Sequence, residues 1–122
     1  MNILIVDDNA HDREAISFFL NSHGYDQIVQ AENGEECIAM ALEHFPDVVI
    51  LDVQLPDIQG YGICKALKSQ PVLNCQIILM TGQFQLNDPY LASDASPDYF
   101  LAKTGVYDEL LKILRSMEAA ES

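Results

Sequence analysis

Three short segments of this chain are apolar on successive residues, and they constrain its fold more than any other feature. The segments cover residues 3–6, 48–51 and 77–80. A strand with one face in water alternates apolar and polar side chains, whereas a strand buried on both faces is apolar throughout. We therefore predict a parallel sheet that is covered by helices on both faces.

Strand and helix signals alternate along the rest of the chain. The expected strands cover residues 2–6, 27–31, 47–51, 76–81 and 98–102, and the expected helices cover residues 12–22, 33–44, 60–69 and 105–117. Gly24 can end the first helix and Asn33 can cap the second. Right-handed crossovers between such units give a doubly wound α/β domain with strand order 2-1-3-4-5, here expected over residues 1–122.

The least regular stretch covers residues 83–97, where a fourth helix should connect the last two strands. It contains Pro89 and Pro97 among several residues that favour turns. Proline removes a backbone donor and interrupts a helix. We expect the fourth helix to be short, broken or mobile.

Composition and charge limit the kinds of partner. The chain has 122 residues, of which 49% are hydrophobic, so it can bury a core. Its net charge of −13 repels nucleic-acid phosphates. No apolar run approaches the roughly 20 residues of a membrane span, and the chain does not start like a signal peptide. We expect a cytoplasmic protein that binds neither nucleic acid nor membrane directly.

The cysteines and histidines form no metal-binding pattern. The cysteines are Cys37, Cys64 and Cys75, and the histidines are His11, His23 and His44. The cysteines include no CxxC pair, so we expect buried free thiols in a reducing compartment. The histidines lie beside helix ends without metal-ligand spacing, so we expect solvated surface side chains.

Polar side chains end or follow four of the five expected strands. Asp7 and Asp8 follow the first strand, Asp52 the third and Lys103 the fifth, while Thr81 ends the fourth. Ligands of open parallel sheets bind beyond the carboxyl ends of the strands, where the strand order reverses. With the first and third strands side by side, we expect all five residues to share one rim.

The chemistry of this rim follows from its charges. Three close carboxylates repel one another, and a hard divalent cation such as Mg²⁺ would relieve that repulsion. A carboxylate can also attack phosphorus and form an acyl phosphate. Asp52 lies between the acid pair and the Thr81–Lys103 pair. The metal on one side, Lys103 on the other and the Thr81 hydroxyl would then stabilise the phosphoryl oxygens.

Several motifs together carry a resemblance to a known family. They are Ile5-Val6-Asp7-Asp8-Asn9, Val49-Ile50-Leu51-Asp52, Leu55-Pro56-Asp57-Ile58-Gln59-Gly60, Met80-Thr81-Gly82 and Lys103. This set resembles the response-regulator receiver domain of two-component signalling, a chemotaxis-regulator-like domain with a flavodoxin-like fold. The resemblance spans essentially the whole chain and includes the spacing of the five polar positions.

The resemblance implies a role for each acid of the rim. Asp52 would be the phosphoacceptor. Asp7 and Asp8 would be the metal-binding pair, with Asp8 the better candidate for a direct ligand. Asp52 and the backbone carbonyl of Gln54 would complete the protein's share of the Mg²⁺ shell.

The resemblance also implies a switch and partners. Thr81 would be the switch hydroxyl, Lys103 the cation that pairs with the phosphate, and Phe100 the aromatic switch residue, unless Phe100 is plain core. A sensor histidine kinase or a His phosphotransfer protein would supply the phosphoryl group, and phosphorylation would change the binding of a downstream protein. The domain itself would catalyse only its own phosphorylation and slow self-dephosphorylation.

Two alternatives stay open at this point. Thr104 follows Lys103 where the family usually has proline, and together with the irregular fourth helix it allows a pseudo-receiver that docks partners without phosphate. The intact acids argue against this reading. A phosphohydrolase of the haloacid dehalogenase type also uses a strand-end aspartate, Mg²⁺, Thr or Ser and Lys. That family has a second acid two residues after the nucleophile, where this chain has Gln54.

Overall fold

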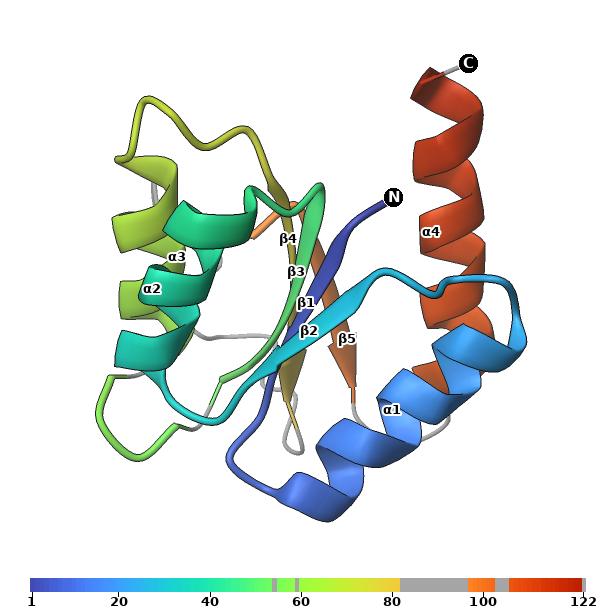
Figure 1. Cartoon of the computed structure of the whole chain (residues 1–122), viewed down its shortest axis with the longest axis horizontal. Helices are drawn as coiled ribbons and strands as arrows, with labels where there is room; N and C mark the ends of the chain where they lie inside the picture. The colour runs from blue at the N-terminus through green and yellow to red at the C-terminus, as the bar shows by residue number, and fades with distance from the viewer. Residues whose placement is uncertain (54, 59, 82–96, 103–105, 122) are drawn as a thin grey trace.

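The computed structural model is a five-stranded parallel sheet with helices on both faces (Figure 1). It describes residues 1–53, 55–58, 60–81, 97–102 and 106–121. The strands are β1 (Ile3–Val6), β2 (Ile28–Ala31), β3 (Val48–Asp52), β4 (Gln76–Thr81) and β5 (Tyr99–Ala102). The helices within these ranges are α1 (Ala10–Ser22), α2 (Gly34–His44), α3 (Gly60–Lys68) and α4 (Val106–Glu121). The strand order β2-β1-β3-β4-β5 confirms the predicted doubly wound α/β fold.

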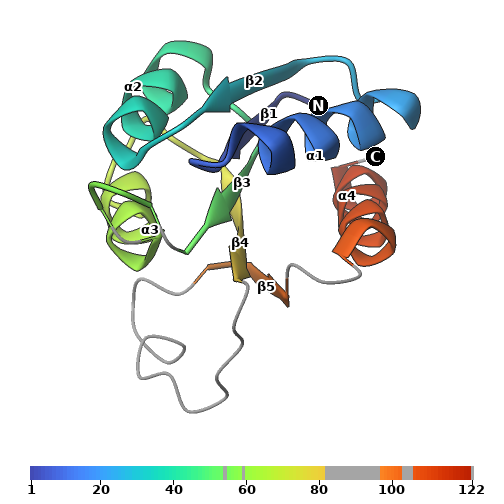
Figure 2. The ribbon, with the colours of Figure 1, turned by 90° about the horizontal axis from the view of Figure 1, so that it is seen from below.

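Successive residues of the inner strands belong to two different cores. Ile3 and Ile5 of β1 pack in the core that includes residues of α1 and α4, whereas Leu4 and Val6 pack in the core that includes residues of α2 and α3. Figure 2 shows α1 and α4 on one side of the sheet and α2 and α3 on the other. Side chains alternate across a strand, so a strand with a core on each face is apolar at every position.

Short-range capping sets the limits of the first two helices. α1 begins two residues earlier than predicted, because the side chain of Asn9 accepts the N–H of Asp12 at 3.1 Å and caps the helix. The predicted stop is confirmed at Gly24, whose φ of 96° favours glycine. The predicted cap of α2 is also confirmed, since Asn33 accepts the N–H of Glu36 at 2.7 Å.

The last helix corrects a prediction. The sequence predicts that this helix ends at Met117, but α4 continues to Glu121. The Tyr25 hydroxyl donates to the carboxylate of Glu118, and the guanidinium of Arg115 lies 5.3 Å from the centroid of the Tyr25 ring. Burial raises the pKa of Tyr25 to about 12, so the hydroxyl keeps its donor proton. These contacts hold the final turns against the loop after α1.

The side chain of Asp98 fixes the start of β5. β5 begins at Tyr99, one residue later than predicted, and the preceding Asp98 accepts the N–H of Ile77 at 2.8 Å. The Lys68 ammonium of α3 also pairs with Asp98 at 3.1 Å. The predicted irregular fourth helix lies almost entirely in residues 82–96, outside the described residues.

The histidines and the helices bear on the predicted surface of the domain. His11, His23 and His44 are all exposed, which confirms their predicted place on the surface. Across the described ranges, none of the helices combines the length and the apolar character needed to cross a membrane.

Truncation in the central strand should destabilise the domain strongly. Ile50 is 1% exposed, and Ile50→Ala should lower the free energy of unfolding by about 2–5 kcal/mol, since it leaves a cavity beneath α1 and α4. Urea denaturation followed by circular dichroism measures this. Phe18→Ala is the control, because Phe18 is 76% exposed and its loss should change stability by less than about 0.5 kcal/mol. Equal effects of the two substitutions would contradict the described packing.

The three cysteines differ in burial. Cys37 and Cys64 are free and buried between the sheet and the α2–α3 layer, as predicted, whereas Cys75 is only partly buried. Burial raises the pKa of Cys37 and of Cys64 to about 12, because it disfavours the charged thiolate.

Alkylation should therefore be selective in the folded protein. At pH 8, iodoacetamide should modify Cys75 first and leave Cys37 and Cys64 unmodified, because the reagent must reach the thiolate and Cys75 is the least buried of the three. Peptide mass spectrometry of native and urea-unfolded samples identifies the modified residue. Rapid native labelling of Cys37 or Cys64 would show that the α2–α3 layer opens.

Candidate functional site

Three carboxylates meet at the carboxyl ends of β1 and β3. Val6 pairs with Leu51 in the parallel ladder, so the next residues, Asp7 and Asp52, continue from neighbouring positions. Carboxylate oxygens of Asp7, Asp8 and Asp52 all lie within 4.8 Å of one another. The structure thus brings together the three acids that the sequence placed on one rim.

The burial of these acids makes their mutual repulsion costly. Asp7 is 2% exposed and Asp52 is 7% exposed, while Asp8 is open to solvent. Carboxylates this close together repel one another, and a bound cation would relieve that repulsion. Three anionic oxygen donors with one open side suit a hard divalent cation such as Mg²⁺, which prefers oxygen ligands and keeps several waters. The donor set therefore fits the predicted metal.

The turn between β1 and α1 is held by a residue that the sequence analysis missed. The Arg13 guanidinium donates to the backbone carbonyl of Asp7 at 2.7 Å and to the side-chain oxygen of Gln30 on β2 at 2.9 Å. The Asp7 carboxylate also accepts the N–H of Asn9 at 2.9 Å. Arg13 is the only Lys or Arg before Lys65, and this isolation could have drawn attention to it.

The other predicted site residues lie on or beyond β4. Asp52 pairs with Met80, and the next residue of β4, Thr81, pairs with Ala102 of β5. The backbone of Thr81 therefore lies at the carboxyl end of the strand next to β3. Lys103, the residue after Ala102, falls outside the described residues.

Gln54, Thr104 and Phe100 also belong to the predicted site region. Gln54, predicted as a backbone-carbonyl ligand, and Thr104 lie outside the described residues. Phe100 is partly buried and packs against the core beneath α2 and α3, which fits a packing role. Its role as a switch stays a prediction.

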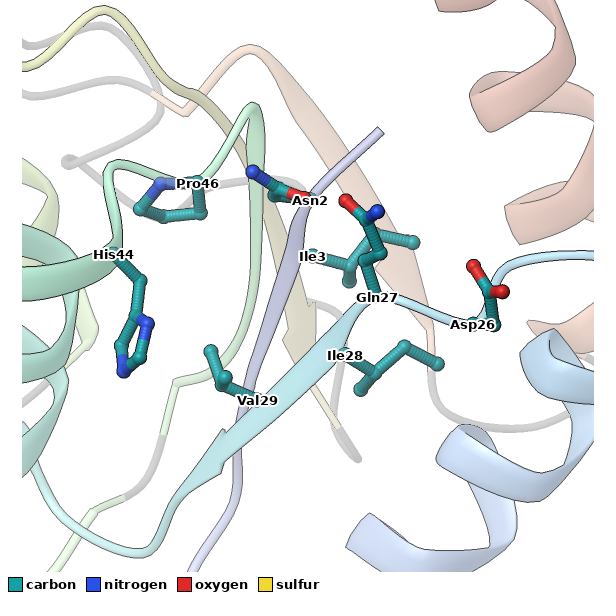
Figure 3. A pocket seen from close by; sticks show the side chains of 8 residues that line it. All are labelled: Asn2, Ile3, Asp26, Gln27, Ile28, Val29, His44 and Pro46. Carbon is teal, nitrogen blue, oxygen red and sulfur yellow. The ribbon is translucent and has the colours of Figure 1, made fainter.

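A hollow lies away from the acid cluster of Asp7, Asp8 and Asp52, near the amino ends of β1 and β2 (Figure 3). Its lining residues are Asn2, Ile3, Asp26, Gln27, Ile28, Val29, His44 and Pro46. Figure 3 shows the titratable side chains, Asp26 and His44, well separated, with β2 between them. Ligands of parallel sheets bind at the carboxyl ends of the strands. The acid cluster, and not this hollow, is therefore the candidate functional site.

Comparisons with known proteins agree with this geometry. The family model described as the response regulator receiver domain matches residues 3–115. The transcriptional regulatory protein KdpE of Mycobacterium tuberculosis is 33% identical over 114 residues, which cover 93% of this chain and 49% of that protein. The chain therefore spans about half the length of this curated relative.

Solved structures show the same fold. A chemotaxis response regulator of Vibrio cholerae is 28% identical with a TM-score of 0.84, and the match covers 94% of this chain and 96% of that one. The response regulator protein TrrA of Thermotoga maritima, solved in complex with Mg²⁺-BeF, is 31% identical with a TM-score of 0.79. That match covers 95% of this chain and 98% of the other.

Magnesium should stabilise the domain through the acid cluster. At a Mg²⁺ concentration 100 times the dissociation constant, wild-type protein should gain about 2.7 kcal/mol. Asp8→Asn should remove most of this gain, yet be no less stable than wild type in metal-free buffer, since it removes one of three repelling charges. Thermal denaturation with and without Mg²⁺ measures both effects.

The matched control is Asp26→Asn, which removes the same charge near the amino ends of the strands. Its response to Mg²⁺ should equal that of wild type. A metal centre at this rim would be contradicted if Mg²⁺ did not stabilise the wild-type protein, or if it stabilised Asp8→Asn as much as wild type.

Proposed function

Because this chain belongs to the response-regulator receiver family, we propose that it is a signalling domain whose Asp52 carboxylate accepts a phosphoryl group. The donor would be a sensor histidine kinase or a His phosphotransfer protein. The observation that carries this proposal is the cluster of Asp7, Asp8 and Asp52, whose oxygens lie within 4.8 Å of one another at the reversal point of the strand order.

In the proposed reaction, a carboxylate oxygen of Asp52 attacks the phosphorus of a phosphohistidine. A bond forms between that oxygen and phosphorus, and the bond between phosphorus and the histidine nitrogen breaks. Asp7, Asp8, Asp52 and the backbone carbonyl of Gln54 would hold Mg²⁺. When bound, this cation supplies positive charge to the transferring phosphoryl oxygens.

The chain's own residues prepare the site for this reaction. Two hydrogen bonds orient Asp7. The N–H of Asn9 donates to its carboxylate, and the guanidinium of Arg13 donates to its backbone carbonyl. The exposure of Asp8 leaves the rim open to a donor protein. We assign the remaining phosphoryl contacts to the Lys103 ammonium and the Thr81 hydroxyl, which would neutralise and orient oxygens away from the metal.

Phosphorylation would be read by a protein partner. We propose that Thr81 and Phe100 respond to the phosphoryl group and so alter the binding of a downstream protein, followed by slow self-dephosphorylation. A single receiver domain over residues 1–122, a cytoplasmic location and the absence of direct nucleic-acid or membrane binding stay predictions.

The two alternatives gain no support from the comparisons. A haloacid-dehalogenase-type enzyme would need a second acid at position 54, and this chain has glutamine there. A pseudo-receiver would have no need for two buried carboxylates beside a third.

Acetyl phosphate and Mg²⁺ should add one phosphoryl group to the wild-type protein. Intact-mass spectrometry should show a single adduct, and Asp52→Asn should abolish it, because the amide cannot act as the nucleophile. The adduct should also require Mg²⁺ and disappear in the presence of a chelator.

Asp26→Asn is again the matched control and should be phosphorylated like wild type. Wild-type protein that stays unmodified would favour the pseudo-receiver. Rapid turnover of a phosphate monoester such as p-nitrophenyl phosphate would favour the phosphohydrolase.

A further inference from the structure

The carboxylate of Asp57 connects the loop after Asp52 to the start of α2. One oxygen accepts the N–H of Gly34 at 2.7 Å, and the other accepts the N–H of Glu35 at 2.9 Å. The first oxygen also accepts the N–H of Ile58 within the loop at 2.9 Å. One exposed side chain therefore binds backbone donors of two segments that are 22 or more residues apart.

These bonds differ from ordinary helix capping. α2 already has its own cap, since Asn33 accepts the N–H of Glu36 at 2.7 Å. Asp57 satisfies the two preceding donors, Gly34 and Glu35, which helix geometry leaves without a partner inside the helix. Its bonds, that of Gly34 above all, lower the pKa of Asp57, so at neutral pH it is a carboxylate with full acceptor capacity.

Two glycines allow close packing on either side of this loop, Gly34 against side chains and Gly60 against the backbone of Asp52 and Val53. A Cβ on Gly34 would lie 2.9 Å from the Cδ1 atom of Ile63 and 3.2 Å from the Oδ1 atom of Asp57. A Cβ on Gly60 would lie 2.8 Å from the backbone oxygen of Asp52. Larger residues would therefore push α2 away from the loop, or the loop away from Asp52.

The two ends of the loop are joined at Val53, the residue after Asp52. The N–H of Gly60 donates to the carbonyl of Val53 at 2.7 Å, and the N–H of Val53 donates to the carbonyl of Met80 at 2.9 Å. The loop is thus closed at its base against β3 and β4 and held near its tip by Asp57. A shift of the tip would be transmitted through Gly60 to the backbone that carries Asp52.

We propose that Asp57 is a positioning residue for the acid cluster: by fixing the loop against α2, it sets the metal affinity of Asp7, Asp8 and Asp52. The inference rests on the proposed function of that cluster as a Mg²⁺ and phosphoryl site. Asp57 is not itself a member of the group of acids within 4.8 Å of one another. It therefore acts through the loop and not as a ligand.

The test compares Mg²⁺ binding by calorimetry at a temperature where every variant is folded. Asp57→Ala should weaken Mg²⁺ binding roughly tenfold, the size typical of residues that orient metal ligands. Asp57→Asn keeps one acceptor oxygen and should give an intermediate affinity. In phosphorylation by acetyl phosphate, both variants should require more Mg²⁺ but reach the wild-type rate at saturating Mg²⁺.

The matched control is Asn33→Ala, which removes a cap from the same turn of α2 but leaves the loop contact intact. It should lower the thermal midpoint as Asp57→Ala does, yet bind Mg²⁺ like wild type. Amide hydrogen exchange gives a readout without any reaction. Mg²⁺ should slow the exchange of the Gly34 and Glu35 amides in wild type but not in Asp57→Ala.

The outcomes separate this inference from the proposed function. If Asp57→Ala and Asp57→Asn bind Mg²⁺ like wild type, or if Asn33→Ala weakens binding equally, Asp57 is only a helix cap and the inference is wrong. The phosphoacceptor role of Asp52 would then be untouched. If wild-type protein neither binds Mg²⁺ nor accepts a phosphoryl group, the proposed function fails and the inference fails with it.

Discussion

The parallel pairing of β1 with β3 is the interaction on which both the fold and the candidate site depend. It joins segments more than 40 residues apart in a fixed register, with Val6 opposite Leu51. Because side chains alternate across a strand, a slip of one residue would exchange the two cores and separate Asp7 from Asp52. The hydrophobic cores on the two faces therefore fix the geometry of the carboxylates.

The pairing of β1 with β3 also keeps three carboxylates together although they repel one another. The acid cluster lies within a chain whose net charge is −13, and two of its three members are buried. Like charges at this separation destabilise the folded protein, so other parts of the structure must offset them. The continuous apolar packing of the inner strands provides this, and a cation at the rim would remove much of the cost.

The sequence predicted the features that depend on local pattern and on topology. Unbroken apolar runs indicated burial on both faces, and the strand order then placed Asp7, Asp8 and Asp52 together. What it did not predict are contacts between side chains distant in the sequence. The extension of α4 depends on Tyr25 and Glu118, 93 residues apart, and the hold on α2 depends on Asp57. No periodicity or spacing reveals such pairs, because each partner alone resembles an ordinary surface residue.

The bonds between Asp57 and the first turn of α2 have a consequence for regulation. Thermodynamic linkage is reciprocal, so if this contact strengthens metal binding, metal binding must strengthen the contact by the same factor. A protein that competes for the N–H groups of Gly34 and Glu35 would then weaken cation binding by up to that factor, although it never touches the acids. Conversely, loading with metal would make the start of α2 harder to occupy. Metal binding at the acid cluster and partner binding at the start of α2 would therefore oppose each other.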